Sequence, residues 1–406
     1  MDRWEKVCTI IMAGGRGERL FPLTRDKAKP AITFGGIYRI IDFTLSNCLN
    51  SGIRRIYVLT QYGSLSLDLH LRLHWNLMRP EFGEYLYSVP PQQITTNRWY
   101  RGTADSIYQN LFLLEQERPE HVLILSGDHV YKMDYGDLLD FHLAKNADLT
   151  VATVIVPREE GRAFGILHTA ADGEVVEFLE KPKDPPPMPG HPDLALASMG
   201  VYVFKAPVLV QEVIQDAKNP ASKHDFGMNI IPQMVGRKRV FAFPFGDPAT
   251  GTPRYWRDIG QLDAYFAAHQ DLLGENPVFD LFSGDWPIRG ALSLLPPAKF
   301  FGREGQVTVT DSLISAGCVL QEARVVRSVL SPGVRVARGA QVEEAVLWDG
   351  VRVGVEARIR RAVIEEGVHI PPRFTIGYNP EADARHFTVT PGGVVVVPSN
   401  VVLEAP

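Results

Sequence analysis

The stretch VCTIIMAGGRGERLFPLTRDKAKP, Val7–Pro30, joins a run of apolar residues to a turn rich in glycine and cationic residues. Its last nineteen residues, Met12–Pro30, hold three glycines, three arginines and two lysines. The apolar run is typical of a buried strand, and a glycine turn after such a strand lets backbone N–H groups approach a ligand closely. Because a helix start after the turn adds a positive field, the expected ligand is a phosphate.

Two common phosphate-binding motifs do not fit this turn. A P-loop ends in Lys-Ser or Lys-Thr, which is missing here, and a dinucleotide fingerprint needs a third glycine where the chain has Leu20. The remaining pattern, G-G-x-G-x-R-L, favours a triphosphate, because Arg16 and Arg19 are able to hold a departing pyrophosphate bidentately. Lys29, in a loop stiffened by Pro30, adds a charge near the reacting phosphate. A tight turn with incidental charge is the alternative.

Length and composition limit the class of protein. A chain of 406 residues is expected to form two domains, and 45% apolar and 22% charged residues are ordinary for a globular enzyme. The net charge of −5 argues against a nucleic-acid partner. Three scattered cysteines show no disulfide or zinc pattern, which favours a reducing, cytoplasmic compartment. The N-terminus does not look like a secretory signal, and no run of about 18 apolar residues predicts a membrane span.

The first two-thirds of the chain alternate short apolar runs with helical patterns. Strands are expected over 7–13, 53–60 and 121–128, and helices over 39–52 and 104–117. This βαβα order predicts a doubly wound, mostly parallel α/β sheet. Ligands of such sheets bind beyond the carboxyl ends of the strands, so the glycine turn and Asp128 are expected to face one cleft.

A different pattern begins after LSLLPPAKF, Leu292–Phe300, which is the expected boundary between domains 1–291 and 292–406. Glycines then recur at spacings of 16, 17 and 17 residues, with aliphatic residues between them at steps of six and five. The glycines are Gly317, Gly333, Gly350 and Gly367, and the aliphatic residues are Val319, Val325, Leu330, Val336, Val342, Leu347, Val353, Ile359, Ile364, Ile370 and Ile376. Three short strands per coil, each pointing one aliphatic side chain inward, predict a parallel β-helix of hexapeptide type.

The glycine turn and its continuation resemble a known family. The turn is similar to the signature loop of sugar-phosphate nucleotidyltransferases, and FGGIYRIIDFTLSNCLNSGIRRIYVLTQY, Phe34–Tyr62, resembles the glucose-1-phosphate adenylyltransferases among them. WYRGTADS, LSGDHVYKMDY, EFLEKP, HDFGMNIIP and YWRDIG follow in that family's order, so the resemblance covers nearly the whole chain. It implies a Rossmann-like nucleotidyltransferase domain followed by a left-handed parallel β-helix for assembly and regulation.

The resemblance also implies a reaction. The adenylyl group of ATP would pass to α-D-glucose 1-phosphate, giving ADP-glucose and pyrophosphate for glycogen synthesis. The sugar's phosphate oxygen is already a competent nucleophile, so catalysis reduces to alignment and to neutralising charge. Such a site is expected to hold Mg²⁺, cationic side chains and glycines. Asp128, at a strand end, is placed to hold Mg²⁺ against the α-phosphate, with Asp258 as the second ligand.

The same resemblance assigns the other site residues one by one. The expected catalytic residues are Arg16, Lys29 and Asp128. The expected substrate-binding residues are Gly14 and Gly15 for the nucleotide phosphates, Lys181 for the sugar phosphate, Glu180 for sugar hydroxyls, and Tyr100, Gly165, Ser198 and Asp225 for the sugar-nucleotide pocket. His129 is expected to be structural or to contact the metal ligands without binding the metal itself, because Mg²⁺ prefers oxygen. The alternatives are caps for Asp128 and Asp258, a surface ion pair for Glu180 and Lys181, and packing for Tyr100.

Regulation is expected to depart from the family's best-known type. Family members of glycogen-making bacteria are commonly switched by metabolites at the junction between the domains, and Lys27 and Arg39 remain as candidate allosteric residues. Other positions of that sugar-bisphosphate pocket read Asp26, Thr33 and Glu366, and the tail carries no basic residue. Because carboxylates repel an anionic activator, fructose 1,6-bisphosphate is expected to activate poorly.

Three rival functions stay open at this point. The same chemistry on another nucleotide or sugar phosphate fits the same residues, because base selection depends on pocket shape. A non-catalytic regulatory subunit would lack the loop cations or the metal carboxylates, and those named above are all present. An acyltransferase β-helix would need a histidine between coils, with His369 and His386 as candidates. The β-helix is instead expected to pack on partners in a homotetramer, with ATP and glucose 1-phosphate as substrates.

Overall fold

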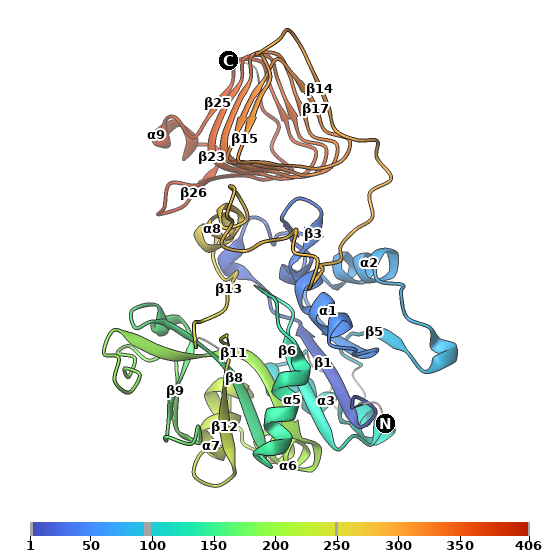
Figure 1. Ribbon diagram of the computed structural model, residues 1–406, viewed down its shortest axis with the longest axis vertical. Coiled ribbons are helices and arrows are strands. Elements are labelled where there is room, and N and C mark those ends of the chain that lie inside the picture. The colour runs from blue at the N-terminus through green and yellow to red at the C-terminus, as the bar shows by residue number, and fades with distance from the viewer. Residues whose placement is uncertain (1–2, 93–98, 248–250, 405–406) are drawn as a thin grey trace.

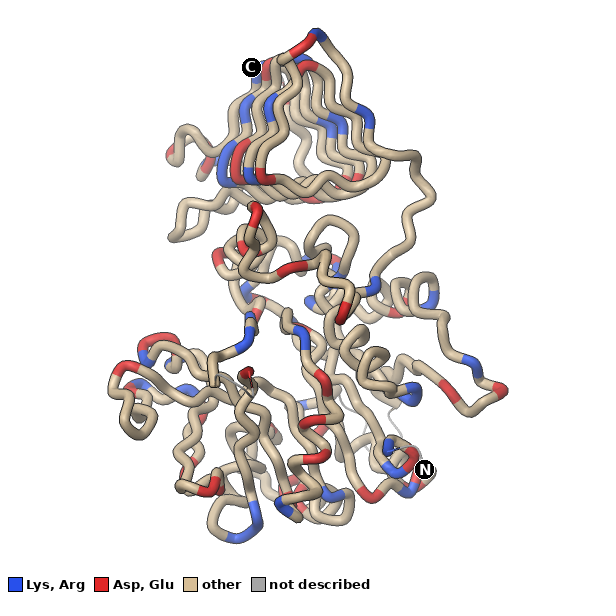
Figure 2. Tube along the Cα trace, viewed as in Figure 1, with Lys and Arg blue, Asp and Glu red and all other residues tan. Residues whose placement is uncertain are grey.

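The computed structural model describes residues 3–92, 99–247 and 251–404 of the chain. Figure 1 shows an α/β part, coloured blue to yellow, and a stack of short strands, coloured orange to red, which lies against one end of it. Lysines and arginines are interspersed with acidic residues over both parts, as Figure 2 shows, in keeping with the net charge of −5. Within the described ranges, no helix has the length and apolar character needed to cross a bilayer.

The α/β part is organised by a mixed sheet, which has nine strands within the described ranges. Its main path runs β10-β9-β11-β6-β1-β4-β5, with β8 beside β11 and β12 beside β8. The four strands β6, β1, β4 and β5 run parallel to one another. Strand β11, on the other side of β6, runs antiparallel to β6. The strands are β1 Val7–Ala13, β4 Arg55–Thr60, β5 Tyr85–Val89, β6 His121–Ser126, β8 Leu149–Pro157, β9 Gly165–Thr169, β10 Val175–Glu180, β11 Leu194–Lys205 and β12 Val240–Pro244. The predicted α/β class is therefore confirmed.

Helices and smaller ladders surround this sheet. The helices are α1 Ile40–Asn50, α2 Ser64–His74, α3 Thr103–Gln109, α4 Leu111–Glu117, α5 Tyr135–Ala144, α6 Ala206–Ala217, α7 Ile231–Met234 and α8 Leu262–Gln270. The smaller strands are β2 Thr33–Phe34, β3 Tyr38–Arg39, β7 His129–Tyr131 and β13 Trp256–Asp258. Short turns of other helix types occur at Glu18–Leu20, Lys29–Ala31, Pro80–Phe82, Glu160–Ala163 and Phe226–Ile230.

The helix expected over 104–117 is interrupted at Asn110. The Asn110 side chain donates to the carbonyl of Ser106 at 2.8 Å, which is the acceptor that its own backbone N–H would use in an α-helix. The Asn110 N–H turns instead to Ile107 O, 3.0 Å away. An asparagine inside a helical pattern thus ends α3 and starts α4.

The C-terminal part is the predicted β-helix. Its strands stack in parallel from coil to coil, and each of the four periodic glycines has a positive φ of 69–75°, which other residues adopt at a cost. The strands are β14 Lys299–Phe301, β15 Thr308–Thr310, β16 Leu313–Ile314, β17 Val319–Gln321, β18 Arg324–Val326, β19 Val329–Leu330, β20 Arg335–Val336, β21 Gln341–Leu347, β22 Arg352–Val353, β23 Arg358–Ile364, β24 His369–Ile370, β25 Thr375–Ile376, β26 Thr388–Val389 and β27 Val395–Val397. Helix α9, Pro380–Asp383, follows β25.

The inward aliphatic residues form ladders along this stack, with one correction to the expected register. Val325 aligns with Val342, Ile359 and Ile376; Leu330 aligns with Leu347 and Ile364; and Val336 aligns with Val353 and Ile370. In the first coil the partner of Val336 is Leu320, not Val319. Leu320 is fully buried, whereas Val319 is half-buried. The expectation for Val319 was wrong because two adjacent aliphatic residues fit a step of five or six equally well.

A second apolar face of the β-helix packs on α8. Val329, Val346 and Val363 stack in register and share one buried cluster with Tyr265 of α8. Trp348 Nε1 donates to the Tyr265 hydroxyl at 2.9 Å. That hydroxyl donates in turn to the carbonyl oxygen of Thr33 at 2.6 Å. Apolar packing and a buried hydrogen-bond chain therefore join the two parts rigidly.

The register correction generates a stability prediction. Leu320→Ala removes a fully buried side chain and should lower the free energy of unfolding by about 2–5 kcal/mol. Val319→Ala, its half-buried neighbour, should lower it by about 1 kcal/mol or less. Calorimetric unfolding of both variants checks the ranking. A larger loss for Val319→Ala would contradict the inward placement of Leu320.

Candidate active site

A cavity of about 360 Å³ opens at the carboxyl ends of β1, β4 and β6. Five predicted site residues line it: Gly14, Gly15, Tyr100, Asp128 and Asp225. A Cβ atom added at Gly15 would meet open space, which leaves the backbone of the turn accessible to a ligand. Parallel strands thus bring the glycine turn and Asp128 to one cleft, as predicted.

The glycine turn packs closely against its surroundings. A Cβ atom on Gly14 would lie 3.1 Å from the Cβ atom of Gln61. Gly17 has a φ of +65°, and a Cβ atom there would lie 2.9 Å from Thr24 Cγ2 and 3.0 Å from Lys29 Cβ. Any larger residue at Gly17 would therefore displace the stem of Lys29.

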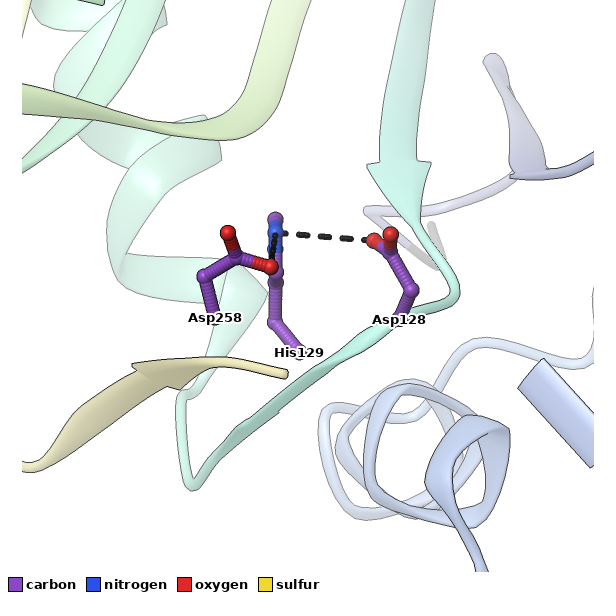
Figure 3. Close-up of side chains that lie close together, drawn as sticks. All are labelled: Asp128, His129 and Asp258. Atoms are coloured by element: carbon purple, nitrogen blue, oxygen red, sulfur yellow. Dashed lines mark ion pairs between the residues drawn. The ribbon is translucent and has the colours of Figure 1, made fainter. Parts of the chain in front are cut away.

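Asp128 and Asp258 meet because two short strands pair. Asp258 ends β13, which runs antiparallel to β7 and places Asp258 opposite His129. Figure 3 shows the His129 ring between the two carboxylates, with Nε2 at 3.5 Å from Asp128 Oδ1 and 3.7 Å from Asp258 Oδ1. One donor atom from each of the three residues lies within 4.8 Å of the others. Two carboxylates and an imidazole form a donor set that fits a divalent cation.

The plainer alternatives for these residues do not match the structure. Helix α8 begins after Gln261 without a side-chain cap, so Asp258 is not the cap of that helix. His129, which we expected to be structural or to contact the metal ligands, points Nε2 at both carboxylates, and its nitrogen belongs to the possible donor set. Its Nδ1 is buried and has no hydrogen-bond partner in the part of the chain that the structure describes.

Lys29 lies against both carboxylates. Its Nζ is 2.6 Å from Asp128 Oδ2 and 3.4 Å from Asp258 Oδ1, and the side chain is 9% exposed. Burial lowers the pKa of Lys29, but the two carboxylates raise it above its ordinary value, so the ammonium is charged at neutral pH. Burial likewise raises the pKa of Asp128, but Lys29 and His129 hold it well below its usual range. Lys29 and Asp128 therefore form a charged pair near neutrality.

Arg16 does not reach the cavity. Its side chain is 63% exposed, with Nη1 at 3.2 Å from Glu18 Oε1. The guanidinium also lies over the ring of Tyr62, 4.8 Å from its centroid, and Tyr62 itself lines the cavity. Arg16 thus stands beside the cavity, against a residue that lines it.

A second group of predicted residues adjoins the cavity beside Asp225. A Cβ atom on Gly165 or on Gly227 would collide with Glu180 Oε2, and Gly227 also lies close to Asp225 Oδ1. Burial raises the pKa of Glu180, although Lys181 opposes this. Lys181 Nζ is 3.1 Å from Glu180 Oε1, and its side chain is 51% exposed. These residues lie outside the cavity lining itself and extend the site along β9 and β10.

Ser198 links this second group to the carboxylates. It lies in β11 where the pairing with β8 shifts register, and its Oγ accepts from Gly200 N at 3.3 Å. A Cβ atom on Gly200 would lie 3.4 Å from His129 Cε1. The irregular turn of β11 therefore packs against the residue that separates Asp128 from Asp258.

Sequence reasoning missed several polar residues of the cavity, including Gln61, Thr103 and Ser106. Gln61 Oε1 accepts from Tyr100 N at 2.7 Å, and Gln61 Nε2 donates to Tyr100 O at 3.3 Å. The Tyr100 hydroxyl accepts from Asn110 at 2.9 Å, so this ring is partly core as well as cavity wall. Gln61 directly follows β4, and the strand-end argument used for Asp128 would have found it.

Lys27 and Arg39 lie at the junction with the β-helix. Lys27 Nζ is 2.5 and 2.6 Å from the two carboxylate oxygens of Glu366 and 4.7 Å from the ring centroid of Trp348. Arg39 Nη2 is 3.7 Å from Asp349 Oδ2. Both cations are thus paired with carboxylates of the β-helix.

Comparisons with known proteins agree with this geometry. A family model described as "Nucleotidyl transferase" matches residues 8–275, and one described as "GlmU-like, C-terminal hexapeptide" matches residues 296–397. A protein of Alkalilimnicola ehrlichii named "Glucose-1-phosphate adenylyltransferase 1" is 51% identical over 391 residues, covering 96% of this chain and 92% of that protein. A second protein of that organism, "Glucose-1-phosphate adenylyltransferase 2", is 49% identical over 392 residues, with the same coverage.

A relative from a second organism is similar over the same length. "Glucose-1-phosphate adenylyltransferase" of Rhodopirellula baltica is 49% identical over 405 residues, covering 98% of this chain and 91% of that protein. The likeness extends across the α/β part and the β-helix together. The matched family models and the full-length relatives lead to one conclusion: the chain belongs to the glucose-1-phosphate adenylyltransferase family of nucleotidyl transferases.

Proposed function

We propose that the chain transfers the adenylyl group of ATP to α-D-glucose 1-phosphate, giving ADP-glucose and pyrophosphate for glycogen synthesis. The observation that carries this function is the convergence of Lys29, Asp128 and Asp258 beside a glycine-lined cavity, in a chain 49–51% identical to relatives of that name. A non-catalytic subunit would not need to retain this charged cluster. The substrates ATP and glucose 1-phosphate follow from the relatives' names.

The reaction needs little covalent chemistry from the protein. A phosphate oxygen of glucose 1-phosphate attacks the α-phosphorus of ATP, the bond between the α-phosphorus and its bridging oxygen breaks, and pyrophosphate leaves with both electrons. Gly14 and Gly15 hold the nucleotide phosphates through backbone N–H groups, and Arg16 and Lys29 stabilise the charge that develops on them. We propose Asp128 and Asp258 as the ligands of Mg²⁺, which when bound supplies positive charge to the α-phosphate and the leaving group.

The sugar phosphate is assigned to the group of residues beside β9, β10 and β11. Lys181 is half-exposed and free to swing from Glu180 to an incoming phosphate, while the partly buried Glu180 carboxylate accepts hydrogen bonds from sugar hydroxyls. Tyr100, Gly165, Ser198 and Asp225 complete the pocket walls. We assign residues 1–291 to the catalytic domain and residues 292–406 to the β-helix domain.

We also propose that the chain assembles as a homotetramer in the cytoplasm. Apolar surface for assembly is available, because Leu65, Leu69 and Leu73 follow one another at steps of four along α2 and are 48–71% exposed. Phe300 and Phe301 are likewise exposed at the first coil of the β-helix. A second copy that covers these side chains would remove them from water.

Regulation at the junction follows from the same charges. Lys27 and Arg39 are the candidate allosteric residues, and each faces a carboxylate that an anionic effector would have to displace. The positive potential of this pair is therefore largely cancelled inside the molecule.

The carboxylate cluster gives the first functional prediction. Asp128→Asn keeps the size of the side chain and removes its charge, so turnover should fall by at least about a hundredfold while the fold is retained. Steady-state rates of ADP-glucose formation and circular dichroism measure the two effects. The matched control is Asp137→Asn, which replaces an exposed carboxylate on α5 by a carboxamide. A near wild-type rate for Asp128→Asn would refute the metal assignment.

A second prediction concerns the sugar phosphate. Lys181→Ala should raise the KM for glucose 1-phosphate by at least about tenfold and leave the KM for ATP nearly unchanged, because the lost charge acts on ground-state binding. Lys183→Ala, an exposed lysine two residues away, should change neither constant. Initial rates with each substrate varied in turn make the comparison. Equal effects on both substrates would remove Lys181 from the sugar site.

A third prediction concerns the effector. Fructose 1,6-bisphosphate at micromolar concentration should change the rate by less than about twofold, because Glu366 and Asp349 neutralise the cations that would bind it. Inorganic phosphate at equal ionic strength controls for salt. Activation by many-fold at micromolar levels would show that the junction binds this anion after all.

A further inference from the structure

An ammonium group contacts both acidic side chains of the active site. Lys29 Nζ approaches Asp128 Oδ2 more closely than His129 Nε2 approaches either carboxylate, at 2.6 Å against 3.5 and 3.7 Å. It also reaches Asp258 Oδ1, so one cation bridges both acidic side chains. Both carboxylates belong to the group of side chains that could hold a divalent cation.

The backbone explains why Lys29 lies there. Lys29 opens the short helical turn Lys29–Ala31, which has Pro30 at its second residue, and its stem packs on Gly17. The main chain is therefore held in place on both sides. The four-carbon stem nevertheless has rotatable bonds, so the ammonium can leave the carboxylates without any movement of the backbone.

The charge of Lys29 affects how a divalent cation would bind to Asp128 and Asp258. Asp128 and Asp258 carry two negative charges, and Lys29 neutralises one of them in a setting with little solvent. A divalent ion at the same oxygens would be repelled by the ammonium at close range, an unfavourable interaction that water screens weakly here. A triphosphate beside the glycine turn offers the ammonium new anionic partners.

We propose that Lys29 and the divalent cation compete for the oxygens of Asp128 and Asp258, so that the metal binds tightly only after nucleotide phosphates draw the ammonium away. This inference rests on the proposed function, because it takes the nucleotide site to be the cavity beside Gly14 and Gly15. Lys29 is then the group that couples metal binding to nucleotide binding. By linkage, each ligand strengthens the other by the same factor.

The test measures metal binding without turnover. Mn²⁺ is titrated into the nucleotide-free full chain, and free Mn²⁺ is followed by electron paramagnetic resonance. Lys29→Gln should bind Mn²⁺ at least about tenfold more tightly than the wild type, although it has lost a residue of the active site. Lys181→Gln makes the same charge change beside the cleft without touching Asp128 or Asp258, and its affinity for Mn²⁺ should stay at the wild-type value.

Thermal unfolding gives a second readout. Lys29→Gln leaves two carboxylates close together, so its midpoint should be lower than that of the wild type without metal and should rise on adding Mn²⁺. The wild-type midpoint should respond little. Lys29→Met, which keeps the apolar stem packed on Gly17, serves as a second variant if the glutamine variant folds poorly.

The outcomes are separable. Equal or weaker Mn²⁺ affinity in both Lys29 variants would overturn the inference, as would a wild-type dissociation constant far below about 1 mM without nucleotide. Formation of ADP-glucose by the wild type is measured in parallel. If the wild type forms ADP-glucose but the Mn²⁺ affinities are equal, the proposed function stands and only the competition is removed. If the wild type forms no ADP-glucose and the affinities are equal, the proposed function is removed as well.

Discussion

The site depends on holding two negative charges together at one point. Asp128, in the turn between β6 and β7, and Asp258, at the end of β13, are partly buried and would repel each other, so they need a cation beside them. The pairing of β7 with β13 sets their separation, and Lys29 offsets their charge. The glycine turn then folds over the lysine stem, which a side chain at Gly17 would displace. Backbone pairing, close packing and charge balance thus meet in one cluster, and the phosphate chemistry is built on it.

The loop that supplies Lys29 also touches the β-helix. Lys27, two residues earlier, is paired with Glu366 and lies over Trp348, while Lys29 is paired with Asp128. Trp348 in turn donates to Tyr265 of α8, within the apolar cluster that joins the two parts of the chain. The residue that contacts the β-helix and the residue that contacts the acidic cluster are therefore only two positions apart in the chain. Lys27 and Lys29 thus connect the β-helix with the acidic cluster through one short loop.

Local patterns predicted much of this molecule correctly, and the exceptions have identifiable causes. Alternating apolar runs led to β1, β4 and β6, and the strand ends led to the glycine turn and Asp128. The expected helix over 104–117 is broken because the Asn110 side chain takes a carbonyl that the helix backbone would use. The first inward residue of the β-helix is Leu320 because spacing does not distinguish two adjacent aliphatic residues. The direction in which the His129 ring points, toward both carboxylates, could not be predicted from the preference of Mg²⁺ for oxygen.

The sequence by itself determined the elements and the fold class, because periodicity, glycine positions and strand ends are local properties of the chain. It also determined which residue types were available for phosphate chemistry, and the family resemblance assigned roles to them. Only the tertiary structure decided which of them meet: Asp258 with Asp128 across a strand pair, Lys29 between them, and Glu366 against Lys27. Such contacts join segments far apart in sequence. They follow from strand pairing and from packing between the two parts, and no local pattern encodes either of these.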